Sequence, residues 1–401
     1  MPKLSPFVAT HANEGFHHLV AENTHLSLTT EQLTQKLEEN PFSYLHIFKP
    51  QIHFNSNDKS GMFYSFGKNY YNQLKEQGVL VKDKTPAYYI YKQKFIDGIE
   101  FIGIVATAAA SDYRNDTIKK HENTLVEKEV LLEKHLDTTG IIGEPVLLTY
   151  KQTDSIDSIV HQIMDSLPTF EFEYNDKSIH TFWKVDSTDF IQSVTQEFAN
   201  VQSFYIADGH HRCAAMARKI EHSNLEDCNM LCYLIPDNQL RILPFYRLLN
   251  LEFNTEELIL SLGEYFELEK VENPYMNLHD NQLLLVLPHA FFLLSLKESF
   301  NAGLVSVLDN LNVSILENFV FKTYFNVEDS RLENKIEYFS GKVPLDKIID
   351  LVNRGDYKLA FSLSSLTTKD IVAISEAGLT MPPKSTYVEP KLLSGCLIHE
   401  F

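Results

Sequence analysis

Two hydrophobic periods run through this chain, and together they predict both helices and strands. Apolar residues three or four positions apart predict helices, which we place over residues 31–39, 63–78, 126–137, 156–167, 190–199, 254–263, 306–321 and 368–377. Runs rich in aromatic and β-branched residues predict strands, which we place over residues 43–48, 86–92, 100–107, 141–150, 170–173, 178–185, 229–236, 240–247, 283–287, 290–296, 358–363 and 394–398. Because these elements alternate irregularly and several strand pairs form hairpins, the pattern predicts an α+β fold with mixed sheets.

The length and the leucine content predict two regions. A chain of 401 residues is long enough for two domains, and the composition becomes richer in leucine after about residue 250. We predict that residues 1–250 carry the chemistry. Residues 251–401 are then a second α/β region, whose late loop closes the pocket.

Composition and charge narrow the class of protein. Hydrophobic residues make up 44% of the chain, with 27 Phe and 19 Tyr, which is ample for a core. A net charge of −19 argues against nucleic acid as a partner, because such a partner needs a basic face. No signal segment and no apolar run of the roughly 18–20 residues that a membrane span needs is visible. These features predict a cytoplasmic protein that acts on a small-molecule substrate and does not bind a membrane.

A dense cluster of ionisable residues stands where a predicted strand turns into a predicted helix. Asp208 and Gly209 end the apolar run 203–207, and His210, His211 and Arg212 follow. A helix start leaves backbone N–H groups unpaired, and its dipole favours an anion there. Gly209 permits a positive φ or a close backbone approach, and a guanidinium suits phosphate. We predict a phosphate-handling site, with an ordinary turn bearing exposed polar residues as the alternative.

A second cluster lies upstream of this turn and contains Lys120, His121, Glu122 and Thr124. Lysine neutralises phosphate oxygens, and a carboxylate beside an imidazole can accept the proton of a hydroxyl. We predict Glu122 as a catalytic base and the other three residues as phosphate ligands. The alternative is a solvated helix start with alternating charges.

A third cluster lies near the end of the sequence. Two prolines precede Lys384, Ser385 and Thr386, so a stiff loop would present an ammonium and two hydroxyls. Lys391 follows the loop, and Arg247 is a candidate second anion clamp. We predict all five as phosphate-binding residues, and a flexible surface tail is the alternative.

The sequence offers few candidates for a metal ligand. The four cysteines have neither zinc-ligand spacing nor a disulfide pattern, and adjacent imidazoles such as His210 and His211 point apart. Magnesium bound to phosphates prefers oxygen ligands, so Asp208 is its predicted ligand. Gly-rich phosphate loops, dinucleotide fingerprints and serine-nucleophile elbows are not found in the sequence.

These stretches resemble a known family. Residues 208–212, followed by Ala214 and Ala215, are similar to the signature of the family called domain of unknown function 1015. The stretches 120–124, 240–244 and 381–391 resemble its other recurring segments in the same order. One departure is that members usually carry an Arg-Pro pair near residue 10, where this chain has Phe7-Val-Ala-Thr-His11.

The turn at residues 208–212 is also similar to one in the ParB/sulfiredoxin superfamily, which includes kinases that act on free serine. The resemblance implies a strand–turn–helix core of that kind, with Asp208, Gly209, His210, His211 and Arg212 lining the phosphate site. It also implies a link to serine biosynthesis. The role of Glu122 as a base has no motif match in those kinases.

The leading hypothesis is therefore a small-molecule phosphotransferase that uses magnesium. It would move a phosphoryl group between ATP, ADP or pyrophosphate and the hydroxyl of serine, or remove phosphate from phosphoserine in reverse. His210, His211 and Arg212 would stabilise the transferring group, while Lys120 and Lys384 would offset the charge of the donor. Glu122 or Asp208 would take the hydroxyl proton, and we expect His211, Glu122 and Lys384 to line one cleft.

Two other functions remain open at this point. A non-enzymatic nucleotide-binding regulatory protein of the ParB type would use the same turn without turnover. A sulfiredoxin-like redox enzyme would need a reactive cysteine inside the turn, whereas Cys213 falls one residue after Arg212.

Overall fold

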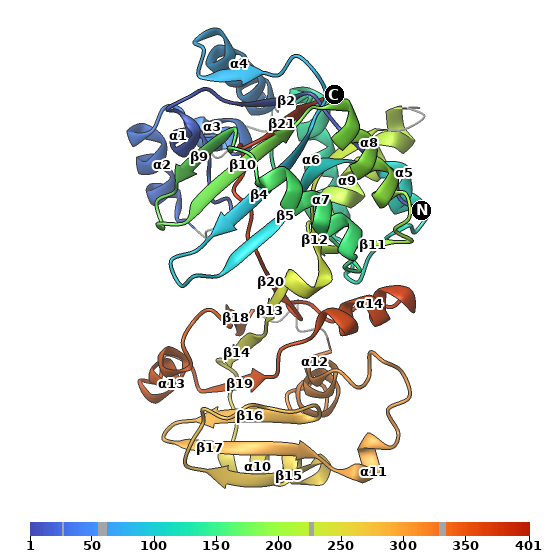
Figure 1. Ribbon diagram of the computed structural model, residues 1–401. Coiled ribbons are helices and arrows are strands. Elements are labelled where there is room, and N and C mark those ends of the chain that lie inside the picture. Colours follow the sequence, from blue (N-terminus) through green and yellow to red (C-terminus); the bar gives the residue numbers. More distant parts are fainter. Residues whose placement is uncertain (26–27, 55–61, 224–227, 329–333) are drawn as a thin grey trace. The chain divides into compact units, whose positions relative to one another are not determined.

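The structure is a computed structural model that describes residues 1–25, 28–54, 62–223, 228–328 and 334–401. Within these residues the chain forms two compact units (Figure 1). The first unit contains residues 1–120, 124–240 and 390–401, and the second contains residues 121–123 and 241–389.

This division differs from the predicted boundary at residue 250 for reasons of strand pairing. Strand β14 (Phe245–Leu249) belongs to the second unit because it pairs with β18 (Ile336–Ser340) and β19 (Leu359–Leu363). Residues 390–401 return to the first unit because β21 (Ile398–Glu400) pairs with β2 (Ala9–Ala12) and β7 (Ile141–Ile142).

A large mixed sheet forms the core of the first unit, in the order β6-β11-β8-β12-β5-β4-β10-β9, with β1 beside β5. Its strands are β1 (Leu4–Ser5), β4 (Tyr88–Lys94), β5 (Glu100–Ala109), β6 (Ile118–Lys119), β8 (Val146–Tyr150), β9 (Phe170–Glu173), β10 (Ile179–Val185), β11 (Phe204–Asp208) and β12 (Asn229–Pro236). Strand β11 is parallel to β6 and antiparallel to β8, and β12 is parallel to β8. The central strands are buried along their length, as their nearly continuous apolar sequences require.

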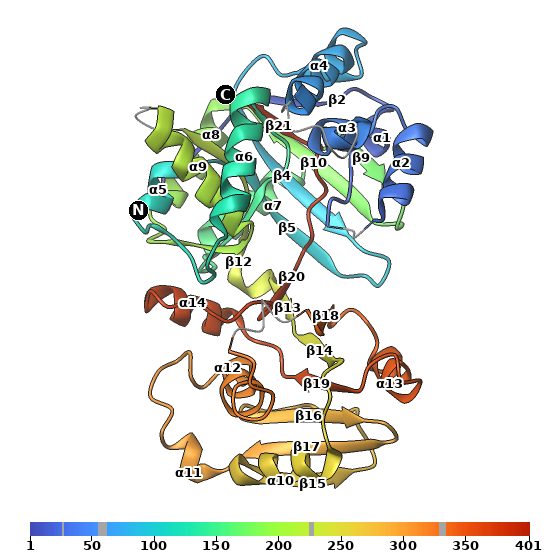
Figure 2. The same cartoon turned by 180° about the vertical axis from the view of Figure 1, so that it is seen from behind.

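Helices cover both faces of this sheet (Figures 1 and 2). Helices α7 (Asp154–Met164) and α8 (Thr188–Phe198) pack together on one face, and α6 (Val126–Thr139) and α9 (His210–Ser223) pack together on the other. A smaller sheet has the order β3-β2-β21-β7. The remaining elements of the unit are α1 (His17–Val20), α2 (Thr30–Glu39), α3 (Leu45–Phe48), η1 (Pro50–His53), α4 (Met62–Glu76), β3 (Leu80–Lys82), α5 (Ala110–Arg114) and η2 (Asp237–Gln239).

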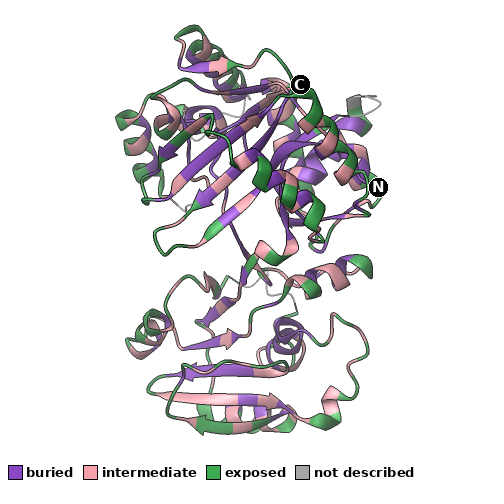
Figure 3. Ribbon diagram, viewed as in Figure 1, coloured by how far each residue is buried: buried purple, intermediate pink, exposed green. Residues whose placement is uncertain are grey.

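The second unit is built on an antiparallel sheet with the order β15-β17-β16-β19-β14-β18. Successive residues of β16 (Gln282–Leu287) point to opposite faces: Leu283 and Leu285 join one apolar core, and Leu284 and Val286 join another. Burial is therefore high along β16 (Figure 3). The remaining elements are β13 (Arg241–Leu243), α10 (Thr255–Tyr265), β15 (Phe266–Val271), β17 (Ala290–Leu296), α11 (Glu298–Asn301), α12 (Asn312–Leu316), a π-helical turn (Glu317–Phe321), α13 (Leu345–Asn353), α14 (Thr368–Glu376) and β20 (Tyr387–Glu389).

The predicted α+β class with mixed sheets is confirmed by this architecture. The hairpin around Gly98 forms as predicted, and so does the hairpin of β16 and β17. Helix α2 begins with a full capping box between Thr29 and Gln32.

Several predicted elements are wrong in type or bounds. One is the predicted strand 240–247, which is β13 and β14 in different sheets. The predicted strand 43–48 contains helix α3 (Leu45–Phe48) instead. Leu45 to Ile47 are all buried, so the alternation of apolar and polar residues did not mark a solvent-exposed face. The predicted strand 141–150 is two strands in different sheets. The predicted helix 306–321 begins only at Asn312, and the closing strand begins at Ile398, after a positive φ of 80° at Gly395.

Candidate functional site

The turn between β11 and α9 depends on Gly209 in two ways. Its φ is +103°, in the left-handed region that favours glycine. A Cβ at this position would lie 2.8 Å from Nη2 of Arg212, so the guanidinium packs directly against the glycine. Both reasons for a glycine that the sequence suggests therefore hold in the structure.

Asp208 is bound by two cations of the first unit. Its Oδ2 accepts a hydrogen bond from Nη2 of Arg212 at 2.8 Å, and its Oδ1 accepts one from Nζ of Lys391 at 2.9 Å. Arg212 also donates from Nη1 to the carbonyl oxygen of Pro145 at 2.8 Å. Two cations around one carboxylate give this group, which we call the Asp208 cluster (Asp208, Arg212 and Lys391), an excess positive charge.

The ionisation of Asp208 follows from these contacts. Burial alone would raise the pKa of Asp208, but the positive charges of Lys391 and Arg212, with a contribution from His25, hold it far below its ordinary value. The carboxylate stays ionised and is a poor proton acceptor near neutral pH.

Two predicted roles of Asp208 do not fit this geometry. A general base needs a pKa near the working pH, which Asp208 lacks. A magnesium ligand needs an available oxygen, whereas both oxygens already accept hydrogen bonds from cations. The described residues also contain no group of three or more His, Cys, Asp or Glu side chains that could hold a metal ion.

The two histidines of the turn have different surroundings. His210 is buried, at 5% exposure, whereas His211 is only partly buried. Burial lowers the pKa of His211, and Lys128 lowers it further while Glu129 opposes the change. Nδ1 of His211 has no hydrogen-bond partner among the residues that the structure describes.

Thr124 joins the same neighbourhood through the packing of α6 on α9. Its Oγ1 donates to Oε1 of Glu129 at 2.5 Å, and Glu129 is buried. Lys120 follows β6, whose parallel pairing with β11 brings the ends of both strands to one edge of the sheet. The Lys120 ammonium lies 5.4 Å from the centre of the Tyr113 ring. The first unit thus contains residues of all three clusters, and the ends of β6 and β11 lie at one edge of its sheet.

The other predicted residues belong to the second unit. His121 is buried, and burial lowers its pKa to about 4. Its carbonyl oxygen accepts a hydrogen bond from the Met381 amide at 2.9 Å, and Nδ2 of Asn123 donates to Oγ1 of Thr380 at 3.1 Å. Glu122, between these two anchored residues, is exposed.

Arg247 does not fit the predicted role of an anion clamp. It is 1% exposed, and it donates to the carbonyl oxygens of Phe245 at 2.7 Å and Lys384 at 3.1 Å. Burial lowers its pKa to about 10. Its cation therefore holds the backbone of the late loop in place inside the protein.

The late loop itself has a specific conformation. Lys384 has a φ of +53°, and its ammonium lies 5.4 Å from the centre of the Phe245 ring. Oγ of Ser385 donates to the carbonyl oxygen of Pro382 at 2.6 Å, and Thr386 is partly buried. Of the predicted ligands in this loop, Lys384 is the exposed one. The expected cleft of His211, Glu122 and Lys384 joins residues of two units and stays a prediction.

A family comparison decides how the chain is classified. The family model described as "Protein of unknown function (DUF1015)" matches residues 4–314. The chain belongs to this family.

Comparisons with individual proteins give these results. No curated protein matches the chain. Among solved structures it is similar to a free serine kinase in complex with AMP, at 13% identity and a TM-score of 0.38, over 74% of this chain and 91% of that one. It is also similar to C-terminally truncated SbnI from Staphylococcus aureus, at 11% identity and a TM-score of 0.39, over 71% and 82%. A conserved hypothetical protein from Pyrococcus furiosus follows at 12% and 0.34, over 72% and 90%.

Two further residues of this DUF1015 family member lie at the Asp208 cluster, although the sequence did not single them out. His25 interacts electrostatically with Asp208, Lys391 and Arg212. Glu144 is buried next to Pro145 and within the electrostatic reach of Arg212. Neither belongs to a dense cluster in the sequence, so only the fold reveals their place.

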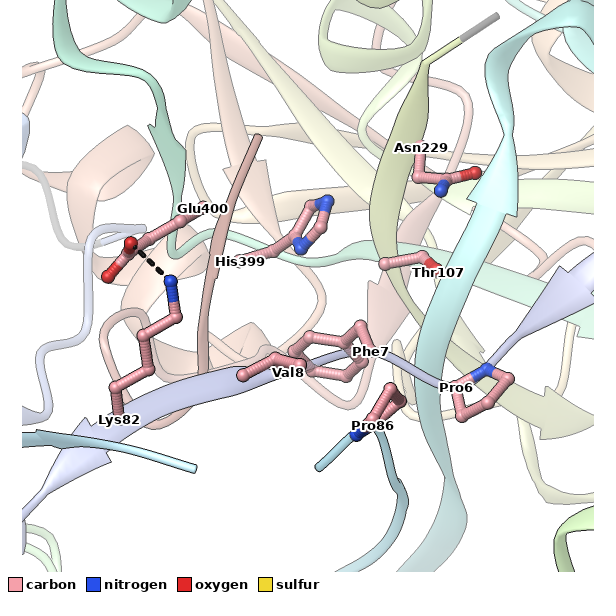
Figure 4. Close-up of a pocket in the computed structure, with 9 residues that line it drawn as sticks. All are labelled: Pro6, Phe7, Val8, Lys82, Pro86, Thr107, Asn229, His399 and Glu400. Carbon is pink, nitrogen blue, oxygen red and sulfur yellow. Dashed lines mark hydrogen bonds and ion pairs between the residues drawn. The ribbon is translucent and has the colours of Figure 1, made fainter. Parts of the chain in front are cut away.

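A cavity of about 330 Å³ in the first unit lies apart from the predicted residues (Figure 4). Apolar side chains of Pro6, Phe7, Val8 and Pro86 face the polar groups Lys82, Thr107, Asn229, His399 and Glu400. An ion pair of 2.7 Å joins Lys82 and Glu400. Glu400 also pairs with Lys75 at 3.0 Å, so two lysines share this carboxylate as well. We base the candidate site on the Asp208 cluster, because it brings together residues from two of the clusters that the sequence predicts.

Two further predictions from the sequence concern a reactive cysteine and a membrane span. Burial raises the pKa of Cys213 to about 12, so its thiol does not fit the reactive cysteine of a redox enzyme. None of the described helices combines the length and apolar character that crossing a membrane requires.

Proposed function

We propose that this protein is a small-molecule phosphotransferase. It moves a phosphoryl group between a nucleotide or pyrophosphate donor and the hydroxyl of free serine, and the reverse direction removes phosphate from phosphoserine. The observation that carries the proposal is the Asp208 cluster at the N-terminus of α9, where two cations share one carboxylate.

The cluster suits an anion for electrostatic reasons. Its excess positive charge adds to the positive end of the α9 dipole. The side chains of Arg212 and Lys391 are 23% and 17% exposed, so a ligand can reach them while they are partly shielded from water. Shielding strengthens the attraction between these cations and a phosphate.

The remaining roles are assigned by elimination and charge. The serine hydroxyl loses its proton to a base as its oxygen attacks the donor's terminal phosphorus. Asp208 is too weak a base for this, and Glu122, a residue of the second unit, stays the one predicted from the sequence. The bond from that phosphorus to the bridging oxygen breaks, and ADP, AMP or phosphate leaves from ATP, ADP or pyrophosphate. Within the first unit, His211 and Arg212 stabilise the transferring group and Lys120 offsets the charge of the donor. The role of Lys384, in the second unit, stays a prediction.

Serine is the first acceptor to test because the turn 208–212 resembles that of kinases acting on free serine, and a role in serine biosynthesis belongs to the same proposal. Phosphorus NMR of the full chain with serine or phosphoserine, and with ATP, ADP or pyrophosphate, follows each transfer directly. Each reaction is run with and without magnesium. We expect phosphoserine to form from serine with at least one donor.

A different outcome would point to the regulatory alternative. If no pair of donor and acceptor turns over while ADP or ATP binds tightly, the phosphotransferase proposal fails. The turn would then serve nucleotide binding alone.

A further inference from the structure

A buried carboxyl group lies beside the Asp208 cluster without a normal partner. Glu144 is 9% exposed, and its Oε1 accepts no hydrogen bond from the residues that the structure describes. The next residue, Pro145, has its carbonyl oxygen bound by Arg212. A buried carboxyl with one oxygen that accepts no hydrogen bond is costly in its charged form. Arg212, the Tyr44 side chain and the backbone N–H of Glu144 oppose this effect, but burial outweighs them, so this position favours a proton.

A phenol and two glycines pack in the surroundings of this carboxyl. A Cβ on Gly143 would lie 2.5 Å from the Tyr44 hydroxyl, and one on Gly395 would lie 2.7 Å from the Tyr44 ring. The Gly395 amide donates to the Gly143 carbonyl oxygen at 2.9 Å, and this bond holds the two backbone segments together around the Tyr44 ring. Tyr44 interacts with Glu144, although its hydroxyl makes no hydrogen bond of normal geometry within the described residues.

Charged and titratable groups on neighbouring elements act on this carboxyl. Arg212 faces it from α9, and Tyr44 faces it from the residue before α3. Arg212 in turn faces Asp208, whose other cation is Lys391, and His25 interacts with all three. The positive charge that acts on Glu144 is therefore the charge that the proposed phosphate ligand would bind.

We propose that binding of a phosphate-bearing anion at Arg212 and Lys391 is coupled to the uptake of a proton by Glu144. This inference rests on the anion site of the proposed function. An anion that neutralises Arg212 removes the charge that stabilises ionised Glu144. The carboxyl then takes a proton, and the buried negative charge next to the bound ligand disappears.

The direction of the pH effect follows from the ionisation of Glu144. Burial raises its pKa to about 7, and Arg212 opposes this rise. A bound anion weakens the opposition, so the pKa of Glu144 is higher in the complex than in the unbound protein. Between these two values, affinity falls with rising pH, by up to about tenfold per pH unit.

Titration calorimetry on the full chain tests the coupling, with ADP and pyrophosphate as the probes. Binding is measured at about pH 7.5 in buffers of different ionisation enthalpy, which yields the number of protons taken up. We expect the wild type to take up more protons than Glu144→Gln, by up to about three quarters of a proton, because about a quarter of Glu144 is already protonated at this pH when its pKa is about 7. The ligand's own protonation contributes equally to both proteins and cancels from the difference.

His25→Asn is the matched control because His25 is another titratable group that interacts with the cluster. We expect this variant to keep the proton uptake of the wild type. Equal uptake in wild type and Glu144→Gln, or loss of uptake in His25→Asn alone, overturns the inference and leaves the anion site intact. If the wild type binds neither probe at any pH between about 5.5 and 8.5, the anion site of the proposed function fails, and the inference fails with it.

A second measurement covers the case in which Glu144→Gln does not fold. Carbon NMR of the wild type with labelled glutamate carboxyl groups follows each titration directly. We expect one glutamate with a midpoint near 7 that moves upward when pyrophosphate is added. A spectrum in which every glutamate titrates near its ordinary value of about 4.3 overturns the inference.

Discussion

Each unit of this protein contains an arginine whose two guanidinium nitrogens bind oxygen atoms, and the two sites differ in burial. Arg212 in the first unit has a side chain that is 23% exposed, and it shares Asp208 with Lys391. Arg247 in the second unit is 1% exposed and binds two backbone carbonyl oxygens. An arginine side chain is therefore accessible to a ligand in the first unit and holds a buried loop in the second. Only burial and the identity of the acceptors distinguish them.

The largest expected effect is on stability, at Arg247. Arg247→Ala removes two hydrogen bonds and a large buried side chain, so we expect a loss of about 3 kcal/mol or more in the free energy of unfolding. Urea denaturation measures it. The matched control in the same unit is Arg241→Ala. The Arg241 side chain is exposed, and its partner Glu389 is buried but also pairs with Lys342. The variant should therefore lose less than about 1 kcal/mol. Equal losses in both variants would contradict a structural role for Arg247.

Arg212 should show the opposite balance. Arg212→Ala is expected to reduce phosphoryl transfer by roughly 100-fold or more, because it removes a charge that stabilises the transferring group. Its effect on the free energy of unfolding should be smaller than that of Arg247→Ala. Rates from phosphorus NMR and denaturation curves separate the two quantities. A variant that unfolds easily yet keeps its rate would reverse the comparison of the two arginines.

Gly209 gives a further test of the Arg212 site, because the Arg212 guanidinium packs against this residue. Gly209→Ala combines a positive φ with a close contact to the guanidinium, and we expect a loss of about 2–3 kcal/mol of stability. Gly15→Ala is the control, since Gly15 has a φ of +84° but no atom within 4 Å of the added Cβ. It should cost about 1 kcal/mol. Thermal unfolding compares them, and equal shifts would mean that the contact with Arg212 is unimportant.

The smallest expected effect is a pH dependence at Glu144. Because burial raises its pKa to about 7, the folded protein holds a proton that the unfolded chain releases at lower pH. The stability that neutral Glu144 contributes is complete below its unfolded pKa and is lost as pH rises through about 7. Glu144→Gln should therefore be more stable than the wild type at about pH 8.5, by about 1–2 kcal/mol, and similar to it at about pH 4. Thermal melts at both pH values check this, and a difference of the opposite sign contradicts the buried proton.

The features that can be predicted correctly from the sequence depend on residues that lie close together along the chain. The double requirement for glycine at position 209 can be read from a strand, an Asp-Gly pair and a helix start, because all three lie within one short stretch. The contact of Lys391 with Asp208 spans 183 positions, and no local pattern encodes it. No local pattern singles out Glu144 for the same reason, because its position near Arg212 depends on the pairing of β8 with β11.

Burial is the other quantity that the pattern did not reveal. Arg247 and Ser385 look like surface ligands in a polar stretch, yet both are buried. The short segment 43–48 was predicted as a strand because its alternation looked half-exposed, whereas its residues from Ser43 to Ile47 are all buried in the structure. The burial of these residues depends on tertiary packing, which a local sequence pattern does not reveal.

The central claim is that the Asp208 cluster handles a transferring phosphoryl group. The most direct measurement is the rate of phosphoserine formation from serine, followed by phosphorus NMR, in the wild type and in Lys391→Met, which keeps the length of the side chain but removes its charge. We predict phosphoserine in the wild type and a rate at least about tenfold lower in the variant, with the same melting temperature. Equal rates in the two proteins would contradict the claim.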